Sequence, residues 1–196
     1  HMGPYGPQPG PGPNPDRAQT RTGPQPGPGP QNKIRFLIIG APQNKLVCLN
    51  AQVNASNTGY HSLRKYKKIN TLIINENELR HEMRDKNSHV EILAKNLSNL
   101  HGIKNLVVTR GKNGAFILKN KDKVIHCPAF ANEVVDKVGA GDAMLAIISL
   151  CLRVNIPEDL ALFFGSLAGA TAVENIGNSK FINKNELLRQ AEYLIK

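Results

Sequence analysis

Short apolar runs separated by polar turn segments dominate the chain after residue 33. Four of these runs have the length and the β-branched content of buried strands: residues 34–39, 45–49, 71–74 and 105–109. The segment between the first two runs is too short for the crossover helix that parallel neighbours need. We therefore expect these two strands to pair antiparallel, or a natural segment between them to have been removed.

Other segments carry the patterns of a hairpin and of helices. Apolar runs at 115–118 and 123–126 flank a turn and predict a β-hairpin. Helices are predicted where apolar residues recur at helical spacing: 78 to about 100, 143–152, 157–174 and 185–195. Strands that alternate with helices predict a layered α/β sheet.

The first 32 residues differ in composition from the rest. The octet GPQPGPGP occupies residues 6–13 and recurs at 23–30, and such a segment has almost nothing apolar to bury. His1 and Met2 are typical of residues left after removal of an affinity tag. We expect a disordered Gly/Pro-rich arm over 1–32, either an inert linker or a proline-rich docking peptide, followed by a folded domain over 33–196.

The formal net charge of +10 raises the question of nucleic acid. The lysines and arginines are scattered, and no basic run alternates with aromatic residues as a stacking surface requires. A nucleotide, whose phosphates also favour positive surroundings, is the better partner. Cys48, Cys127 and Cys151 lack the spacing of a metal site and fit a reducing cytoplasm. No apolar run reaches the roughly 18 residues of a membrane span, so a membrane is not expected as a partner. Nucleic acid is not expected either, because the basic residues are scattered.

The strongest local signal is the sequence VGAGD at 138–142, which leads directly into an apolar helix. Its small residues allow a tight turn, and the amides of 139–142 can point together at an anion near the positive end of the helix. Asp142 then lies where a carboxylate could accept a proton from a substrate hydroxyl, as a general base does. An ordinary glycine turn capped by Asp142 is the alternative.

Three motifs together resemble those of the PfkB family of carbohydrate kinases. DKVGAGD at 136–142 is similar to the family signature D-x-x-G-A-G-D; NENE at 75–78 is similar to its N-x-x-E motif, and TRGKNG at 109–114 to T-x-G-x-x-G. They occur in the family's order, each after a predicted strand or before a helix. The resemblance implies a ribokinase-like, Rossmann-like α/β domain, of which this chain has the C-terminal, ATP-binding and catalytic part. We expect the N-terminal half, which holds the sugar in the family, to be missing from this chain.

The resemblance also implies roles for individual residues. Asp142 is the implied catalytic base, and Gly139, Ala140 and Gly141 form the anion hole for the transferred phosphoryl group. The residues implied to hold Mg²⁺ and the phosphates, ribose and base of ATP are Asn75, Glu78, Thr109, Gly111, Gly114 and Ser166. Those implied to surround a monovalent cation, K⁺, are Asp136, Val138, Ala172, Asn175 and Gly177.

Structural explanations exist for several of the same residues. Asn75 and Glu78 have the spacing of an N-cap and its capping-box partner. Gly111 and Gly114 are equally consistent with a hairpin turn. The small residues at 168–173 are typical of close helix packing.

The loop at 50–60, with Lys65 and Tyr66, resembles a PfkB subgroup related to heptose-phosphate kinases and sometimes joined to a nucleotidyltransferase domain. This likeness implies contact with a phosphorylated sugar by four amide side chains: Asn50, Gln52, Asn54 and Asn57. A solvated polar loop is the alternative for each of them.

These observations predict a cytoplasmic domain that transfers the γ-phosphoryl of ATP to a sugar or sugar-phosphate hydroxyl with Mg²⁺, truncated here and inactive alone. The alternative is a non-catalytic nucleotide-binding remnant or scaffold in which the proline-rich arm is the working part. We expect self-association through an exposed sheet edge, or a partner in the form of the missing N-terminal half or a fused nucleotidyltransferase domain.

Overall fold

The fold is known from a computed structural model, which describes residues 35–39, 45–51, 63, 66, 68–131, 134–136, 139–174 and 181–196. The arm predicted over residues 1–32 lies outside the described residues, and so does most of the loop at 50–60. Among the described helices, none combines the length and the hydropathy needed to cross a bilayer.

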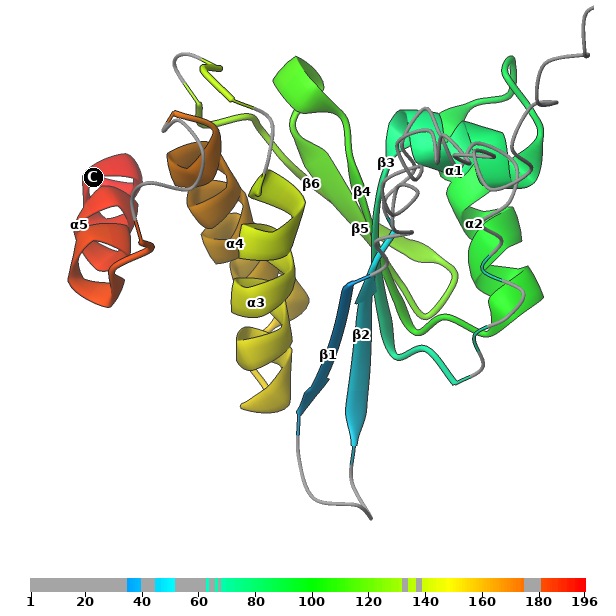
Figure 1. The fold of residues 1–196 in the computed structure, drawn as a ribbon, viewed down its shortest axis with the longest axis horizontal. Helices are drawn as coiled ribbons and strands as arrows, with labels where there is room; N and C mark the ends of the chain where they lie inside the picture. Colours follow the sequence, from blue (N-terminus) through cyan, green and yellow to red (C-terminus); the bar gives the residue numbers. More distant parts are fainter. Residues whose placement is uncertain are drawn as a thin grey trace, which may run out of the picture. The chain divides into compact units, whose positions relative to one another are not determined.

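Six strands of the described residues form one mixed sheet, in the order in which they occur along the chain (Figure 1). They are β1 (Arg35–Ile39), β2 (Leu46–Asn50), β3 (Thr71–Asn75), β4 (Asn105–Thr109), β5 (Ala115–Lys119) and β6 (Lys123–Cys127). The three central strands β2, β3 and β4 are parallel, whereas β1 pairs antiparallel with β2, and β5 with both β4 and β6. The predicted α/β sheet and the antiparallel pairing of the first two strands are therefore confirmed.

Helices cover both faces of this sheet (Figure 1). On one face lie α1 (Glu76–Met83) and α2 (Val90–His101), and on the other lie α3 (Ala140–Arg153) and α4 (Glu158–Val173). The last helix, α5 (Lys184–Ile195), packs against α4. Because side chains alternate along a strand, each strand contributes to two cores. In β3, Leu72 and Ile74 join the core under α1 and α2, and Ile73 joins the core under α3.

The predicted long helix from residue 78 to about 100 is wrong, because the chain forms two helices there. Arg84 ends α1 in a left-handed conformation with φ of 52°. The side chain of Asp85 then accepts hydrogen bonds from the backbone of Asn87 and from the backbone and hydroxyl of Ser88. Such local bonds compete with helical ones, so the run of Asp, Asn and Ser forms a turn although the apolar spacing continues across it.

Glycines on α4 allow it to lie close to α3. A Cβ atom at Gly165 would overlap the side chain of Ile148, and one at Gly169 would lie 3.0 Å from Cγ of Met144. The prediction of close helix packing through small residues therefore holds for this part of α4. The packing fixes α3 beside the sheet, with the beginning of α3 near the carboxyl ends of the parallel strands (Figure 1).

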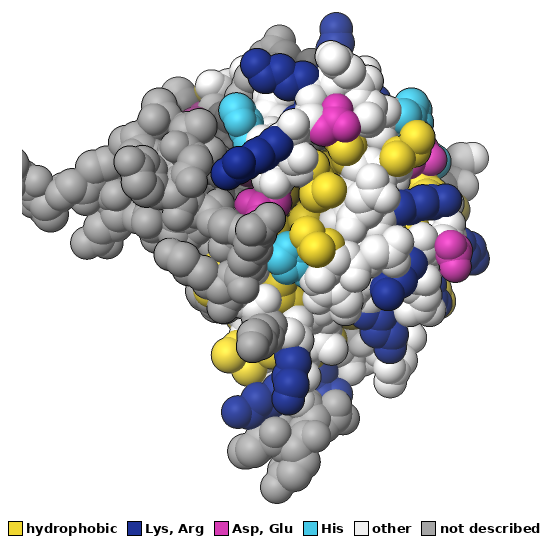
Figure 2. Space-filling view, turned by 90° about the vertical axis from the view of Figure 1, so that its right-hand side faces the viewer, with side chains coloured by type: hydrophobic (Ala, Val, Ile, Leu, Met, Phe, Trp, Pro, Cys, Tyr) yellow, Lys and Arg dark blue, Asp and Glu magenta, His cyan; other side chains and the backbone are white. Residues whose placement is uncertain are grey.

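Figure 2 shows the face of the molecule that carries α1 and α2. Lys and Arg side chains are distributed over it among acidic and hydrophobic ones, and the described residues of this face present no continuous basic field. Ile92 and Leu100 of α2 are exposed there.

The burial of Phe116 in the sheet core leads to the first testable prediction. Phe116 of β5 is fully buried, whereas Phe181 is 90% exposed. We expect Phe116→Ala to lower the free energy of unfolding by about 3–5 kcal/mol, because it removes buried area and leaves a cavity. Phe181→Ala is the matched control and should change it by less than about 0.5 kcal/mol. Urea titration followed by circular dichroism measures both, and equal effects would contradict the described burial.

Candidate active site

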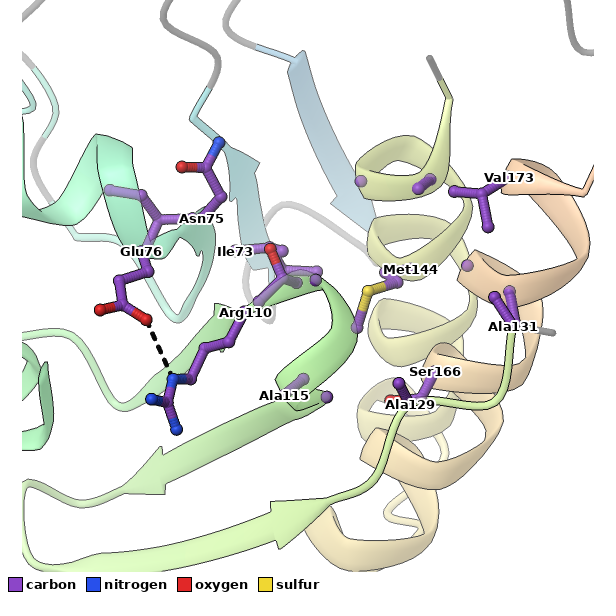
Figure 3. A pocket seen from close by; sticks show the side chains of 18 of the residues that line it. Ile73, Asn75, Glu76, Arg110, Ala115, Ala129, Ala131, Met144, Ser166 and Val173 are labelled. Carbon is purple, nitrogen blue, oxygen red and sulfur yellow. Dashed lines mark hydrogen bonds and ion pairs between the residues drawn. The ribbon is translucent and has the colours of Figure 1, made fainter. Parts of the chain in front are cut away.

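The carboxyl ends of the parallel strands border a pocket of about 750 Å³. Figure 3 shows its two sides: Asn75, Glu76 and Arg110 lie on one, Ala129, Ala131, Ser166 and Val173 on the other, with Met144 between them. The predicted site residues that line this pocket come from five separate parts of the chain: Asn50, Asn75, Glu78, Thr109, Gly111, Gly114, Gly139, Ala140, Gly141, Asp142 and Ser166. The fold thus brings together most of the described residues singled out from the sequence.

The first turn of α3 forms one wall of the pocket. Gly139 is the N-cap of α3 and has φ of 93°, a conformation that favours glycine. The helix begins at Ala140, and the first amides of a helix have no partner within it. Together with the helix dipole, these amides favour an anion in the pocket at this point.

Asp142 lies in this first turn, and its side chain contacts β2. Its Oδ1 accepts a hydrogen bond of 3.2 Å from Nδ2 of Asn50, the last residue of β2. Gln52, Asn54 and Asn57, predicted with Asn50 to contact a phosphorylated sugar, lie outside the described residues.

Asn75 and Glu78 form a capping box at the beginning of α1. The backbone N–H of Glu78 donates to Oδ1 of Asn75 at 2.8 Å, and the backbone N–H of Asn75 donates to Oε2 of Glu78 at 2.9 Å. The structural explanation for their spacing is therefore correct. Both residues also line the pocket, which leaves room for the predicted contact with Mg²⁺ and phosphates. That contact stays a prediction.

Glu76, which sequence reasoning missed, links two arginines at the rim of the pocket. Its Oε1 accepts from Nη2 of Arg80 at 2.7 Å, and its Oε2 accepts from Nε of Arg110 at 3.0 Å (Figure 3). Partial burial alone would raise the pKa of Glu76, but hydrogen bonds and positive charge from the two arginines outweigh it and lower the pKa below its ordinary value. The spacing of Glu76 and Arg80 was a signal for an i,i+4 pair. No local signal connects Glu76 with Arg110, 34 residues away.

The TRGKNG segment forms the connection between the antiparallel strands β4 and β5. Residues Gly111–Asn113 make one turn of 3₁₀ helix, and the N–H of Arg110 donates to the carbonyl of Gly114. Gly114 has φ of 76°, and a Cβ there would overlap the carbonyl oxygen of Cys127. The hairpin-turn explanation of Gly111 and Gly114 is therefore correct, although both also line the pocket.

The three cysteines are buried free thiols. Burial raises the pKa of each, and at Cys127 the neighbouring Ser166 hydroxyl partly offsets this effect. Since the thiolate is the reactive form, the structure gives none of the three the environment of a nucleophile.

Two of the five residues predicted around a monovalent cation are described. Asp136 and Ala172 do not line the pocket, and Val138, Asn175 and Gly177 lie outside the described residues. The backbone N–H groups of Val135 and Asp136 both donate to the carbonyl of Val173, at 2.9 and 3.0 Å. The segment of Val135 and Asp136 therefore lies against the end of α4, and the cation site stays a prediction.

The Glu76 pair predicts a pH dependence of stability. A carboxyl group whose pKa is lower in the folded state stabilises the fold above its unfolded pKa, about 4.3 for Glu, and loses that contribution as the pH falls through the folded value. We expect the difference in urea midpoint between wild type and Glu76→Gln to be largest above about pH 5 and to shrink toward pH 3. Glu192→Gln, on the exposed side of α5, is the control and should show a small difference at every pH. A constant difference for Glu76→Gln would contradict the ion-pair arrangement.

Comparison with known proteins places these features in a family. The sequence model of the pfkB family of carbohydrate kinases matches residues 36–185. Bifunctional protein HldE of Geobacter metallireducens is 38% identical over 74 residues, which are 38% of this chain and 15% of that protein. HldE of Koribacter versatilis is 36% identical over 87 residues, which are 44% of this chain and 18% of that protein.

Solved structures with similar folds include two sugar kinases. Ribokinase from Thermotoga maritima has 26% identity and a TM-score of 0.57, covering 63% of this chain and 42% of that one. Phosphofructokinase-2 from Escherichia coli, in complex with substrates and products, has 23% identity and a TM-score of 0.59, covering 66% of this chain and 42% of that one. The chain thus spans less than half of the relatives it resembles. With the family match over most of its length, it belongs to the pfkB family of carbohydrate kinases.

Proposed function

We propose that the pocket binds ATP and that the protein transfers the γ-phosphoryl group to a hydroxyl of a sugar or a sugar phosphate. One observation carries this proposal: the first turn of α3, including Asp142, lines the same pocket as the ends of β2, β3 and β4. Backbone amides there stabilise the charge of a transferring phosphoryl group, and the carboxylate accepts the proton of the attacking hydroxyl. Positioning and charge stabilisation account for most of the catalysis in such reactions.

The two sides of the pocket suit the two ends of a nucleotide. The side formed by residues 128–131 and by Gly169, Ala170 and Val173 of α4 offers small and apolar groups, which suit a flat base. Ser166 lies on this side, consistent with its predicted place near the base (Figure 3). The other side carries polar groups at the strand ends, and the volume of about 750 Å³ is within the usual range of ligand pockets.

Mg²⁺ fits this arrangement as a partner of the nucleotide. Among the described residues, no group of three His, Cys, Asp or Glu side chains could hold a metal by itself. Mg²⁺ usually binds through one or two carboxylates together with substrate phosphates. Glu78, with Asn75 beside it, would hold the ion in this way, and the ion would supply neutralisation of phosphate charge.

A K⁺ site around Asp136 and Ala172 is the next part of the proposal. Phosphofructokinase-2 from Escherichia coli has been solved in complex with potassium, and its fold is similar to this one. In this chain, the N–H groups of Val135 and Asp136 donate to the carbonyl of Val173, so the segment with Asp136 lies beside the end of α4, which also carries Ala172.

The identity of the sugar acceptor and of further partners rests on the relatives. HldE is a bifunctional protein, which supports a fused nucleotidyltransferase domain or a separate N-terminal half as partner of residues 33–196. A phosphorylated sugar is the acceptor that the likeness to this group favours. A cytoplasmic location is part of the same proposal.

Nucleotide binding by the pocket is tested first. We expect the chain to bind ATP and ADP with Mg²⁺ in isothermal titration calorimetry. Ala140→Glu should weaken both, because it places negative charge at the amides of α3, whereas Asn99→Glu, exposed on α2, is the control with the same charge change and should bind normally. Absence of nucleotide binding by the wild type would contradict the proposal.

Asp142→Asn tests the proposed base. It should keep the affinity for ATP within about threefold and lower phosphoryl transfer to sugar phosphates by about 10²–10⁴-fold, since a general base contributes to rate rather than to binding. Transfer is measured from ADP formation with a panel of sugars and sugar phosphates. Because the chain is expected to be inactive alone, wild type and variant are compared after the N-terminal half of a relative has been restored. Full activity of the variant would then remove Asp142 from the role, and nucleotide binding without transfer by the restored wild type would favour the non-catalytic alternative.

A further inference from the structure

Asn50 joins the end of β2 to the residue proposed as general base. Its side-chain Nδ2 donates to Oδ1 of Asp142 at 3.2 Å, across 92 positions of sequence. Asn50 is only 8% exposed, and the bond is partly buried at the wall of the pocket. A hydrogen bond to a charged acceptor in such a place is stronger than one at an open surface.

The neighbouring Gly141 shows independently how closely Asn50 lies against α3. Gly141 is in the first turn of α3 without the positive φ that would by itself favour glycine. A Cβ atom at this position would lie 2.7 Å from Nδ2 of Asn50 and 3.1 Å from its Oδ1. The glycine therefore makes room for the carboxamide, which rests directly on the turn that carries Asp142.

The backbone of Asn50 is itself held firmly. It is paired with Ile73 in the parallel ladder between β2 and β3, and the next residue, Ala51, donates its N–H to the carbonyl of Ile73 at 2.9 Å. The side chain is thus a donor carried by the hydrogen-bonded end of β2. Asp142, in contrast, lies in the first turn of a helix, where fraying is common.

We infer that Asn50 is a positioning residue, which fixes the orientation of the Asp142 carboxylate in the pocket through this hydrogen bond. A neutral carboxamide suits the role, because it supplies a donor without adding a second negative charge beside the carboxylate. The catalytic meaning of this role rests on the proposed function of Asp142. The contact between Asn50 and Asp142 does not depend on the proposed function. It gives Asn50 a role other than the sugar contact predicted from the sequence.

Nuclear magnetic resonance on the whole chain tests the contact without any ligand. The side-chain amide resonances of Asn50 should move with pH as Asp142 titrates, and Asp142→Asn should abolish the movement. Glu76, Glu78 and His81 also line the pocket, so any shift that persists in Asp142→Asn belongs to them. Amide resonances of Asn50 that do not respond to Asp142 would overturn the inference.

Scalar couplings between Hα and Hβ of Asp142 test the positioning. In the wild type they should be unequal, as for a single rotamer, and in Asn50→Leu they should become nearly equal through averaging. Asn70→Leu is the matched control, because Oδ1 of Asn70 accepts from the N–H of Val47 and the residue does not line the pocket. It should leave the couplings unchanged, and a single Asp142 rotamer retained in Asn50→Leu would overturn the inference.

Asn50→Asp is nearly isosteric and guards against a packing defect in Asn50→Leu. Two facing carboxylates repel each other when both are ionised. If the wild type transfers the phosphoryl group, both variants should lower kcat about 10–100-fold at unchanged KM for ATP. Asn50→Asp should also move the acid limb of the pH profile of kcat to higher pH. Unchanged kcat in both would overturn the positioning role. If the wild type transfers nothing even with the N-terminal half restored, the proposed function fails, and the resonance experiments still decide on the contact.

Discussion

Parallel pairing of β2 with β3 and of β3 with β4 determines where the pocket can be. Strands that run in one direction end at one edge of the sheet, and the register places Asn50 opposite Ile73 and Asn75 opposite Thr109. Residues far apart in sequence are thus neighbours at this edge. The antiparallel strand β5 begins at this edge, and β6, which is antiparallel to β5, ends there. Among the described residues, each segment that lines the pocket follows or precedes one of these strand ends, or belongs to the helices that pack beside them.

The position of α3 depends on packing rather than on the strand register. Met144 and Ile148 of α3 belong to the core on one face of the sheet, with Cys48 and Ile73, and they meet Gly169 and Gly165 of α4. Larger residues at those glycines would push the helices apart and move the first turn of α3 away from the strand ends. The amides of that turn can therefore act on a ligand only because small residues about 25 positions later in the chain allow the approach.

Sequence patterns predicted the elements whose signal is local. The bounds of β4 agree with the apolar run at 105–109, and the β5–β6 hairpin and the three C-terminal helices agree within a few residues. The turn at 84–89 was missed, because apolar spacing continued through it while Asp85 and Ser88 formed competing local bonds. Most of the described motif residues line one pocket, although Asp136 does not, and their roles stay predictions. The contacts of Asn50 with Asp142 and of Glu76 with Arg110 were not foreseen, since they follow from tertiary packing between segments with no shared periodicity.

The charges around the pocket differ from those of the chain as a whole. The chain carries a formal charge of +10, yet Glu76, Glu78 and Asp142 line the pocket, and Arg110 is the one Lys or Arg among the described lining residues. Part of its charge is neutralised by Glu76 at 3.0 Å. Among the described lining residues the side chains are net negative, so the attraction for a triphosphate that these residues offer comes from the amides of α3, with a divalent cation carried by the nucleotide. The same balance explains why a neutral asparagine at the end of β2 is well suited to hold Asp142. A cation there would attract the phosphates away from the amides, and an acid would add to the repulsion that the metal must overcome.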